Sequence, residues 1–360
     1  METQPQYLAL YQKVREQITA GDFAYGAKLP SKRVLAEREH VSVITVAHAY
    51  EILCEEGYVE AREKSGYYVR YRASDGFAVQ PHADFARSVP DMPQGTQTFS
   101  YSVLAKTVRF VLSEYGERVM IKTEHAGLPL LREAIAAYLA RSRGIHVEAE
   151  QIFIGAGAEY LYTMLIRLLG TDRVYGLEDP SYHKIRQIYE GSGVVCRMLK
   201  LGTDGILSAD LAQTDASVLH ITPYRSFPSG VTASVPKRME YAHFVQMGDR
   251  YLIEDDVESE FTLLGKMEDT VFSIDTKERV IYLNTFTKTI SPALRIAYAI
   301  LPKALLPRWR ENAGYFSCPV ATLEQYLVAE LLRRGDFERQ INRVRRQKRR
   351  LAAEQRSPRE

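Results

Sequence analysis

The sequence predicts an α/β main domain with a mainly parallel sheet, preceded by a small winged helix-turn-helix domain. After about residue 98, short apolar runs alternate with amphipathic helical stretches, which is typical of a layered α/β fold. Before residue 72, three helical stretches lead into two short strands. Residues 73–98 mix prolines, glycines and polar residues without a sustained period, as linkers do. We therefore expect domains at residues 1–72 and 99–360, joined by that linker.

The composition suits a protein with a large core. The chain has 360 residues, of which 46% are apolar, and 47 basic against 45 acidic side chains give a net charge of +2. Whole-chain charge therefore does not indicate nucleic-acid binding, so any surface for nucleic acid must be local.

Metal sites and membrane segments are not expected. Cys54, Cys196 and Cys318 are widely separated and match no metal-ligand spacing, so we expect core packing as their role, without disulfides. The chain does not open on a basic head followed by an apolar signal core. No stretch approaches the roughly 20 apolar residues that span a bilayer. We expect a cytoplasmic protein.

Helical periodicity and capping residues define the first domain. Tyr11, Val14 and Ile18 recur at helical spacing and predict a first helix. Ser31 is expected to cap a second, short helix, and Ser42 a third. Residues 58–60 and 66–69 then predict two strands around a polar tip. Three helices and a hairpin make a winged helix-turn-helix.

In such a module the second helix of the pair enters the major groove of DNA, where outward side chains meet the bases. The residues that we expect at the DNA are Ser31, Lys32, Arg33, Ser42, Thr45, His48, Lys64 and Gly66. The alternative is a protein-binding domain, because short three-helix modules with a hairpin also serve that purpose.

Residues 29–33, 41–46, 49–51 and 56–58 together resemble the DNA-binding domain of the GntR family. The resemblance covers about residues 7–70 and implies a double-stranded DNA operator as partner. One position departs from the family, which usually has an arginine after the valine-serine pair where this chain has Val43. Operator affinity or sequence preference is expected to differ accordingly.

Six apolar runs of the second domain are expected to form its strands. These are residues 151–154, 173–176, 194–198, 217–221, 251–253 and 280–283.

The most informative stretch of the second domain is residues 285–292 with Arg295. Lys288 could form a Schiff base with pyridoxal 5'-phosphate. Thr285, Thr287 and Arg295 could neutralise the phosphate dianion through hydroxyl hydrogen bonds and a guanidinium fork. This pattern predicts a cofactor site.

A glycine-containing turn could hold the same phosphate. Gly155, Ala156, Gly157 and Ala158 follow a predicted strand and open a predicted helix over residues 159–169, so free amides would face an anion at the positive helix end. The alternative is a tight strand-to-helix connection without a ligand.

Two further residues are placed to contact the cofactor ring. Asp255 ends an apolar strand and could pair with the pyridinium nitrogen, and Tyr182 could stack on the ring. The alternatives are a helix-capping or solvated acidic run for Asp255 and a packed core tyrosine for Tyr182. For Asp256, Glu258 and Glu260 we expect the helix-capping or solvated run.

The second domain resembles the fold type I aminotransferase domain. The motifs that carry the resemblance are residues 127–132, 155–158, 178–182, 223–230, 253–261 and 285–295. Joined to the winged helix, the chain over about residues 7–350 resembles the MocR subfamily of GntR regulators. The resemblance implies a transcription factor that binds pyridoxal phosphate through Lys288. It also implies a head-to-tail homodimer and an effector that is a vitamin B6 form or an amino compound.

The same resemblance implies a role for three residues. Asp255 would pair with the ring nitrogen, Tyr182 would stack on the ring, and Arg295 would bind the phosphate.

Three features depart from the family. Val257 stands where a tyrosine usually hydrogen-bonds the ring hydroxyl, and residues 225–226 are Arg-Ser where His-Gln is usual. Relatives continue as a C-terminal subdomain that carries the arginine for a substrate carboxylate, so we expect residues 99–360 to lack most of that subdomain.

Three functions remain in competition. The leading hypothesis is a DNA-binding regulator whose ligand shifts the arrangement of two winged helices. The second is an active aminotransferase in which Lys288 moves a proton, although the missing carboxylate arginine argues against efficient turnover. The third is a truncated DNA-binding remnant without a cofactor response. We expect a regulator without enzymatic activity.

Overall fold

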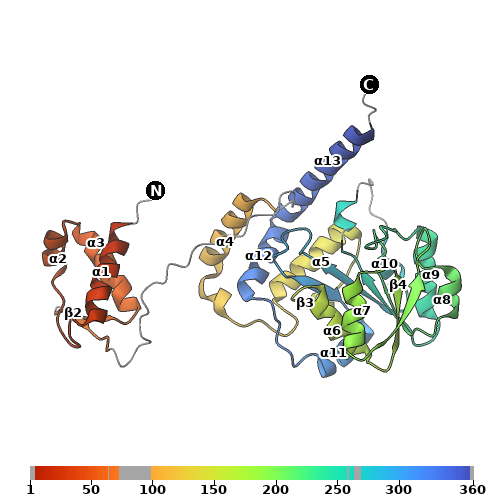
Figure 1. The fold of residues 1–360 in the computed structure, drawn as a ribbon, viewed down its shortest axis with the longest axis horizontal. Coiled ribbons are helices and arrows are strands. Elements are labelled where there is room, and N and C mark those ends of the chain that lie inside the picture. Colours follow the sequence, from red (N-terminus) through yellow and green to blue (C-terminus); the bar gives the residue numbers. More distant parts are fainter. Residues whose placement is uncertain (1–4, 64, 73–98, 258, 263–268, 357–360) are drawn as a thin grey trace. The chain divides into compact units, whose positions relative to one another are not determined.

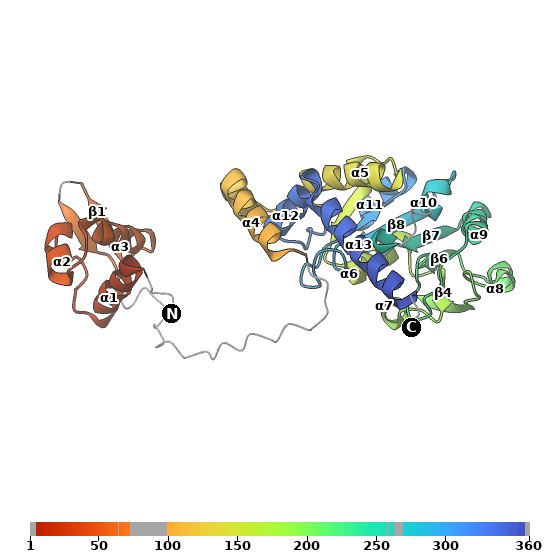
Figure 2. The same cartoon turned by 90° about the horizontal axis from the view of Figure 1, so that it is seen from above.

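The computed structural model describes residues 5–63, 65–72, 99–257, 259–262 and 269–356, with side chains described as far as Arg350. The chain divides into two units, Met1–Pro93 and Gln94–Glu360. Figures 1 and 2 show the helices and strands of each unit. Each unit has its own hydrophobic core. The predicted combination of a winged helix-turn-helix and an α/β domain is confirmed.

The smaller unit contains helices α1 (Gln6–Ala20), α2 (Lys32–Glu39) and α3 (Val43–Glu55), followed by strands β1 (Val59–Arg62) and β2 (Gly66–Val69). The two strands pair antiparallel and form the wing. The helices pack on each other through buried residues at helical spacing, among them Val14 of α1 and Tyr50 of α3.

Both predicted helix caps of this unit are confirmed. The Ser31 hydroxyl accepts a hydrogen bond from the Val34 amide at 3.3 Å, and the Ser42 hydroxyl accepts one from the Thr45 amide at 3.0 Å. Each cap satisfies a backbone donor that the helix itself leaves without a partner. The Tyr50 hydroxyl also donates to the Pro30 carbonyl at 2.9 Å, which ties α3 to the start of α2.

The larger unit is built on a seven-stranded sheet in the order β3-β9-β8-β7-β6-β4-β5. Its strands are β3 (Ile152–Gly155), β4 (Val174–Asp179), β5 (Val195–Lys200), β6 (Val218–Ile221), β7 (Tyr251–Asp255), β8 (Val280–Thr285) and β9 (Ala297–Ile300). Strands β5, β4, β6, β7 and β8 are parallel, whereas β9 runs antiparallel to both of its neighbours.

All six predicted runs form strands, but the sequence analysis does not predict β9. This strand is inserted between β3 and β8, and every one of its residues is buried. A four-residue strand that is buried on both faces lacks the alternation of polar and apolar residues that identifies exposed strands.

The helices of this unit are α4 (Tyr101–Tyr115), α5 (Pro129–Arg143), α6 (Ala158–Leu169), α7 (His183–Gly191), α8 (Ser208–Gln213), α9 (Val235–Gln246), α10 (Val271–Ile274), α11 (Leu306–Asn312), α12 (Thr322–Arg333) and α13 (Asp336–Arg356). Short 3-10 turns are η1 (Gly116–Met120), η2 (Ala149–Gln151), η3 (Ser259–Phe261) and η4 (Lys303–Leu305).

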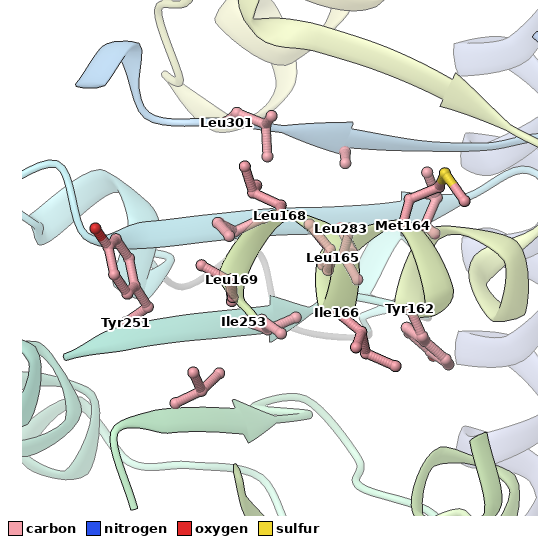
Figure 3. Packing of buried hydrophobic residues seen from close by; sticks show 14 of the residues in the cluster. Tyr162, Met164, Leu165, Ile166, Leu168, Leu169, Tyr251, Ile253, Leu283 and Leu301 are labelled. Atoms are coloured by element: carbon pink, nitrogen blue, oxygen red, sulfur yellow. The ribbon is translucent and has the colours of Figure 1, made fainter. Parts of the chain in front are cut away.

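Helices cover both faces of the sheet. Helices α6, α7 and α11 pack on one face, as Figure 3 shows for Leu165 and Leu168 of α6 over the strands that carry Ile253 and Leu283. Helices α5, α12 and α13 cover the β3-β9-β8 part of the other face, and α8, α9 and α10 cover the rest. The sheet is therefore a rigid inner layer whose carboxyl edge is left to carry a site.

Candidate functional site

A cavity of about 460 Å³ lies at the carboxyl edge of the parallel strands. It is lined by Ala158, Glu159, Tyr162, Tyr182, Ile185, Thr222, Tyr224, Arg225, Phe227, Pro228, Gly230, Asp255, Val257, Thr285, Thr287, Lys288 and Arg295. The parallel strands β4, β6, β7 and β8 end at the same edge of the sheet. This topology brings together residues that lie more than a hundred positions apart in the sequence.

Asp255 is a buried carboxylate of this cavity, with only 2% of its surface exposed. Its Oδ2 atom accepts a hydrogen bond from the Tyr162 hydroxyl and lies 3.6 Å from His220 Nε2. Burial, together with the neighbouring carboxylate, raises the pKa of Tyr162 well above its usual value, so the hydroxyl keeps its proton and donates. The Asp255 carboxylate is therefore held in one orientation.

A hydrogen bond with Tyr189 fixes His220, the histidine next to Asp255. His220 is buried in β6, and its Nδ1 atom lies 2.6 Å from the Tyr189 hydroxyl of α7. The Nε2 atom has no hydrogen-bond partner among the described residues. A buried polar atom of this kind that faces a carboxylate is typical of a site whose polarity serves a ligand.

Lys288 lies in the turn that follows β8 and lines the cavity with an exposed side chain. The turn is held by threonine hydroxyls. Thr285 Oγ1 donates to Thr287 Oγ1 at 2.9 Å, and Thr287 Oγ1 lies 3.5 Å from the Leu294 carbonyl. These hydroxyl groups can reorient toward an anion in the cavity without a change in the backbone.

The positive charge of Arg295 lies over the start of α6. Gly157 has a φ of +88°, which favours glycine there, and the Arg295 guanidinium lies so close that a Cβ atom at Gly157 would be 2.7 Å from its Nη2 atom. Arg295 Nη2 is also 3.7 Å from a carboxylate oxygen of Glu159, with both side chains substantially exposed. A guanidinium and a helix N-terminus that meet in this way suit an anion.

The four residues of the predicted phosphate turn divide between two roles. Ala158 lines the cavity, whereas Gly155, Ala156 and Gly157 are not among its lining residues. A Cβ atom at Gly155 would lie 2.6 Å from Leu161, so this glycine allows α6 to pack closely on β3. Phosphate contacts from these three residues stay a prediction.

Aromatic rings border the cavity. Tyr182 is half-buried, and its ring meets Phe227 edge-on with centroids 6.2 Å apart. Phe227 is 66% exposed, and Tyr224 also lines the cavity. These rings offer an apolar wall for a planar ligand.

The two departures from the family motifs both reach this cavity. Val257 and Arg225 line it, whereas Ser226 turns away and donates to a buried carboxylate oxygen of Glu178 at 2.5 Å. Burial raises the pKa of Glu178 to about 8. The loop after β6 is therefore anchored on β4 and presents an arginine to the cavity.

The prediction of a solvated acidic run is wrong for Asp256 and Glu260, which are 2% and 3% exposed. Asp256 forms a buried ion pair with Arg143 of α5, and Glu260 accepts a hydrogen bond from Asn284 at 2.7 Å. The buried arginine compensates the charge, which sequence spacing could not indicate. Glu258 lies outside the described residues.

Sequence reasoning missed Tyr162, His220 and Glu178. The signal for Tyr162 is its place four residues after Ala158, on the same face of α6. The signal for His220 is a lone polar residue inside an apolar strand, and that for Glu178 is a carboxylate directly after the apolar part of β4.

In the smaller unit, the predicted DNA contacts lie on or near α3 and the wing. Ser42, which caps α3, and His48 are exposed, Thr45 is half-buried, and the His48 ring stacks on Tyr7 at a centroid distance of 4.1 Å. The Thr45 hydroxyl lies 2.8 Å from that of Ser42.

The basic candidates and the wing glycine complete this surface. Lys32 Nζ lies 5.3 Å from the centre of the Tyr67 ring, and a hydrogen bond with Tyr67 raises the pKa of this lysine. Ser31 and Arg33 are exposed at the start of α2. Gly66 opens β2 with a φ of +119°. Lys64 lies outside the described residues.

Two apolar side chains stand among these polar ones. Val43 is 45% exposed and Ile44 is 81% exposed, and both lie in the first turn of α3. Elsewhere, the described residues contain neither a helix long and apolar enough to cross a membrane nor a cluster of side chains suited to hold a metal ion.

Family comparisons agree with both units. The family described as bacterial regulatory proteins of the gntR family matches residues 6–69, and aminotransferase class I and II matches residues 92–359. These aminotransferases are a family that depends on pyridoxal phosphate.

Curated relatives match along the whole chain. The HTH-type transcriptional regulator YdeL of Bacillus subtilis is 32% identical over 95% of this chain and 76% of its own length. The probable rhizopine catabolism regulatory protein MocR of Rhizobium meliloti is 27% identical over 95% of this chain and 74% of its own. The pyridoxine biosynthesis regulator PdxR of Corynebacterium glutamicum is 28% identical over 94% of this chain and 75% of its own length.

A solved structure supports the fold of the larger unit. The α-aminoadipate aminotransferase LysN of Thermus thermophilus, complexed with N-(5'-phosphopyridoxyl)-L-leucine, is 26% identical with a TM-score of 0.61. The match covers 69% of this chain and 64% of that structure's chain.

A GntR-type helix-turn-helix joined to an aminotransferase domain defines a transcriptional regulator. The chain belongs to the MocR subfamily of GntR regulators.

Proposed function

We propose that this transcriptional regulator binds pyridoxal phosphate through Lys288 and uses the occupied cavity to sense an amino compound or a vitamin B6 form. The single observation that supports this most strongly is the composition of the cavity. Two segments, the end of β7 and the connection between β8 and β9, bring Lys288, Asp255 and Arg295 to one space of about 460 Å³. The amine of Lys288 suits an aldehyde, the buried carboxylate of Asp255 suits a pyridine nitrogen, and the guanidinium of Arg295 suits a phosphate.

When bound, pyridoxal phosphate would supply an aldehyde that condenses with an amine, releasing one water, and a protonated ring that withdraws electrons. The residues of the chain would bind and orient it. Asp255 would hold the proton on the ring nitrogen, since the hydrogen bond from Tyr162 keeps its carboxylate in place. Arg295, Thr285, Thr287 and the α6 amides would hold the phosphate, and Tyr182 would cover the ring.

Operator binding would follow from the smaller unit. We infer a homodimer that presents two winged helices to paired half-sites, with a shift in their arrangement when the cavity is occupied. PdxR is named as a regulator of pyridoxine biosynthesis. This relative favours a vitamin B6 form as one candidate effector.

A titration of the purified chain with pyridoxal phosphate tests the cofactor proposal. We expect saturable visible absorption of a lysine Schiff base, absent in Lys288→Ala and retained in Lys303→Ala, whose lysine lies on the surface beside Glu148 at 2.7 Å. Equal absorption in the chain and in Lys288→Ala would contradict the assignment of Lys288. No absorption in either would contradict cofactor binding as a whole.

We further propose that the cavity is used for sensing rather than for transamination. Val257 lines the cavity where the family's tyrosine would donate a hydrogen bond to the ring hydroxyl, and valine cannot form that hydrogen bond. Incubation of the loaded chain with an amino donor and an excess of a second oxo acid as amino acceptor should form no oxo acid from the donor beyond the level of Lys288→Ala. Steady formation of oxo acid that depends on Lys288 would establish the aminotransferase function instead.

A further inference from the structure

We infer that Arg225 binds the carboxylate of the effector, so that the sensed ligand is a primary amine that also carries a carboxylate, as an amino acid does. This inference rests on the proposed function, because the amine of the effector would react at the Lys288 end of the same cavity. It assigns a role to an arginine that stands where relatives usually have a histidine.

Arg225 reaches the cavity from the loop that follows β6. Arg225 follows β6, Asp255 ends β7, and Lys288 follows β8, in that spatial order. Adjacent strands are about 4.8 Å apart, so the ends of β6 and β8 are separated by about 10 Å with Asp255 between them. Arg225 therefore enters the cavity from the β6 side of Asp255, whereas Lys288 enters it from the β8 side. A ligand group that projects toward β6 would meet the Arg225 guanidinium.

The backbone holds Arg225 in a defined position. Its φ is +50°, an uncommon value for a residue with a side chain. The Arg225 amide donates to Thr232 Oγ1 at 3.1 Å, and the next residue, Ser226, donates to the Val231 carbonyl at 2.8 Å. The Ser226 hydroxyl is also bound to the buried Glu178. Because the backbone of this turn is already ordered, binding of an anion to Arg225 costs only the freedom of its side chain.

The charges around the cavity leave Arg225 available. Arg295 has Glu159 beside it, and Asp255 is buried against Tyr162. Arg225 is exposed, lines the cavity, and forms no ion pair with any acidic side chain in the described parts of the chain. A guanidinium without a carboxylate partner, on the wall of a ligand cavity, is suited to a fork-like pair with a ligand carboxylate.

Two stable ligands that differ only in a carboxylate test this inference. N-(5'-phosphopyridoxyl)-L-alanine and N-(5'-phosphopyridoxyl)ethylamine need no Schiff base, so calorimetric titration of the cofactor-free chain measures binding directly. We expect the alanine derivative to bind about tenfold more tightly, which corresponds to about 1.4 kcal/mol. Arg225→Gln should abolish that preference without changing the affinity for the ethylamine derivative, and Arg225→Lys should keep part of it.

Arg197→Gln is the matched control, because Arg197 is exposed on β5 and pairs with Asp215 at 2.9 Å. It should keep the full preference. If both derivatives bind equally well to the chain, or if Arg225→Gln keeps the preference, the role of Arg225 is wrong while the cofactor site stands. If neither derivative binds, the proposed cofactor site is wrong, and the inference falls with it.

A separate observation in the smaller unit carries a second inference, which does not depend on the cofactor. We infer that α3 reads thymine methyl groups through Val43 and Ile44. The N-terminal residues of a recognition helix contact base edges in the major groove. Val43 and Ile44 lie there with 45% and 81% of their surfaces exposed. Thymine is the base that presents a methyl group in that groove.

Replacement of thymine by deoxyuracil, which removes only that methyl group, tests this inference on double-stranded DNA selected from a random pool by the full chain. We expect one or two thymines per half-site at which the replacement weakens binding about threefold or more. The loss should be smaller in Ile44→Ala and Val43→Ala. It should be unchanged in Val34→Ala, which removes a 55% exposed valine from α2. Selected DNA without a sensitive thymine, or failure to select any DNA, would overturn the inference.

Discussion

The two units of this regulator build their functional surfaces in opposite ways. The DNA-contacting candidates of the smaller unit come from one short segment, residues 31–66, and four of the seven that the structure describes are exposed. The cavity of the larger unit gathers residues from 158 to 295, and Asp255 beneath it is almost fully buried. A surface made by one helix and its wing depends on local capping. A cavity made at a sheet edge depends on the packing and charge compensation of the whole fold.

The largest expected effect that sharpens this comparison is loss of the buried ion pair next to the cavity. Arg143→Ala leaves the buried Asp256 without its partner, so we expect the larger unit to lose about 3–5 kcal/mol of stability. Denaturant unfolding measures this. Arg141→Ala, two residues away in an exposed pair with Glu338, should cost at most about 1 kcal/mol. Equal losses in the two variants would contradict the contrast between buried and exposed charge.

Asp255→Asn should have the next largest effect, on the cofactor rather than on the fold. The amide can still accept from Tyr162 but carries no charge for a protonated ring, so we expect affinity for pyridoxal phosphate to fall about 100-fold. Titration by visible absorption measures it. Asp249→Asn on the surface, beside Arg279 at 2.9 Å, should leave the affinity unchanged. An undiminished affinity in Asp255→Asn would show that the carboxylate does not contact the ring.

Glu178 should make the stability of the larger unit depend on pH. Its pKa is raised to about 8 in the fold, against about 4.3 for an unfolded chain. Between these values the folded state holds a proton that the unfolded state has lost, so this residue lowers stability as pH rises. The melting temperature of Glu178→Gln, relative to the unsubstituted chain, should therefore rise by at least about 2 °C from pH 5 to pH 8.

Glu190→Gln controls for the general effect of removing a carboxylate, because Glu190 is exposed and pairs with Arg186 at 2.8 Å. Its relative melting temperature should not rise over the same pH range. If the melting-temperature difference between Glu178→Gln and the unsubstituted chain also stays constant, Glu178 is ionised in the folded state over the whole range from pH 5 to pH 8.

The smallest effect is expected from a helix cap in the smaller unit. Ser42→Ala removes the acceptor for the Thr45 amide and should cost about 1 kcal/mol of stability in that unit. Ser42→Asn should keep most of the stability, because asparagine is also a good cap. A loss as large as that of Arg143→Ala would contradict the view that this surface is built from local and modest interactions.

The same comparison explains how much could be predicted from sequence. The caps at Ser31 and Ser42 and the hairpin depend on neighbours within three or four residues, so spacing identifies them. Lys288, Asp255 and Arg295 stand out because their residue types match a cofactor chemistry at strand ends. The structure brings these three into one cavity, although their contacts with a cofactor stay a prediction.

Contacts between distant segments could not be predicted in this way. The link between Arg143 and Asp256 spans 113 residues, and that between Tyr162 and Asp255 spans 93. Such pairs are set by which strands and helices become neighbours, and the insertion of the unpredicted β9 between β3 and β8 changes those neighbours. The sequence therefore predicted a solvated acidic run at Asp256 and Glu260, although both side chains have buried partners in the fold.

The central claim is that occupation of the cavity changes how the winged helices bind DNA. The most direct test measures the affinity of the full chain for its selected DNA with and without saturating pyridoxal phosphate, in parallel with Lys288→Ala. The account predicts that the cofactor changes the affinity of the unsubstituted chain and leaves that of Lys288→Ala unchanged. Identical affinities of the unsubstituted chain with and without cofactor, when absorption shows the cofactor bound, would contradict it.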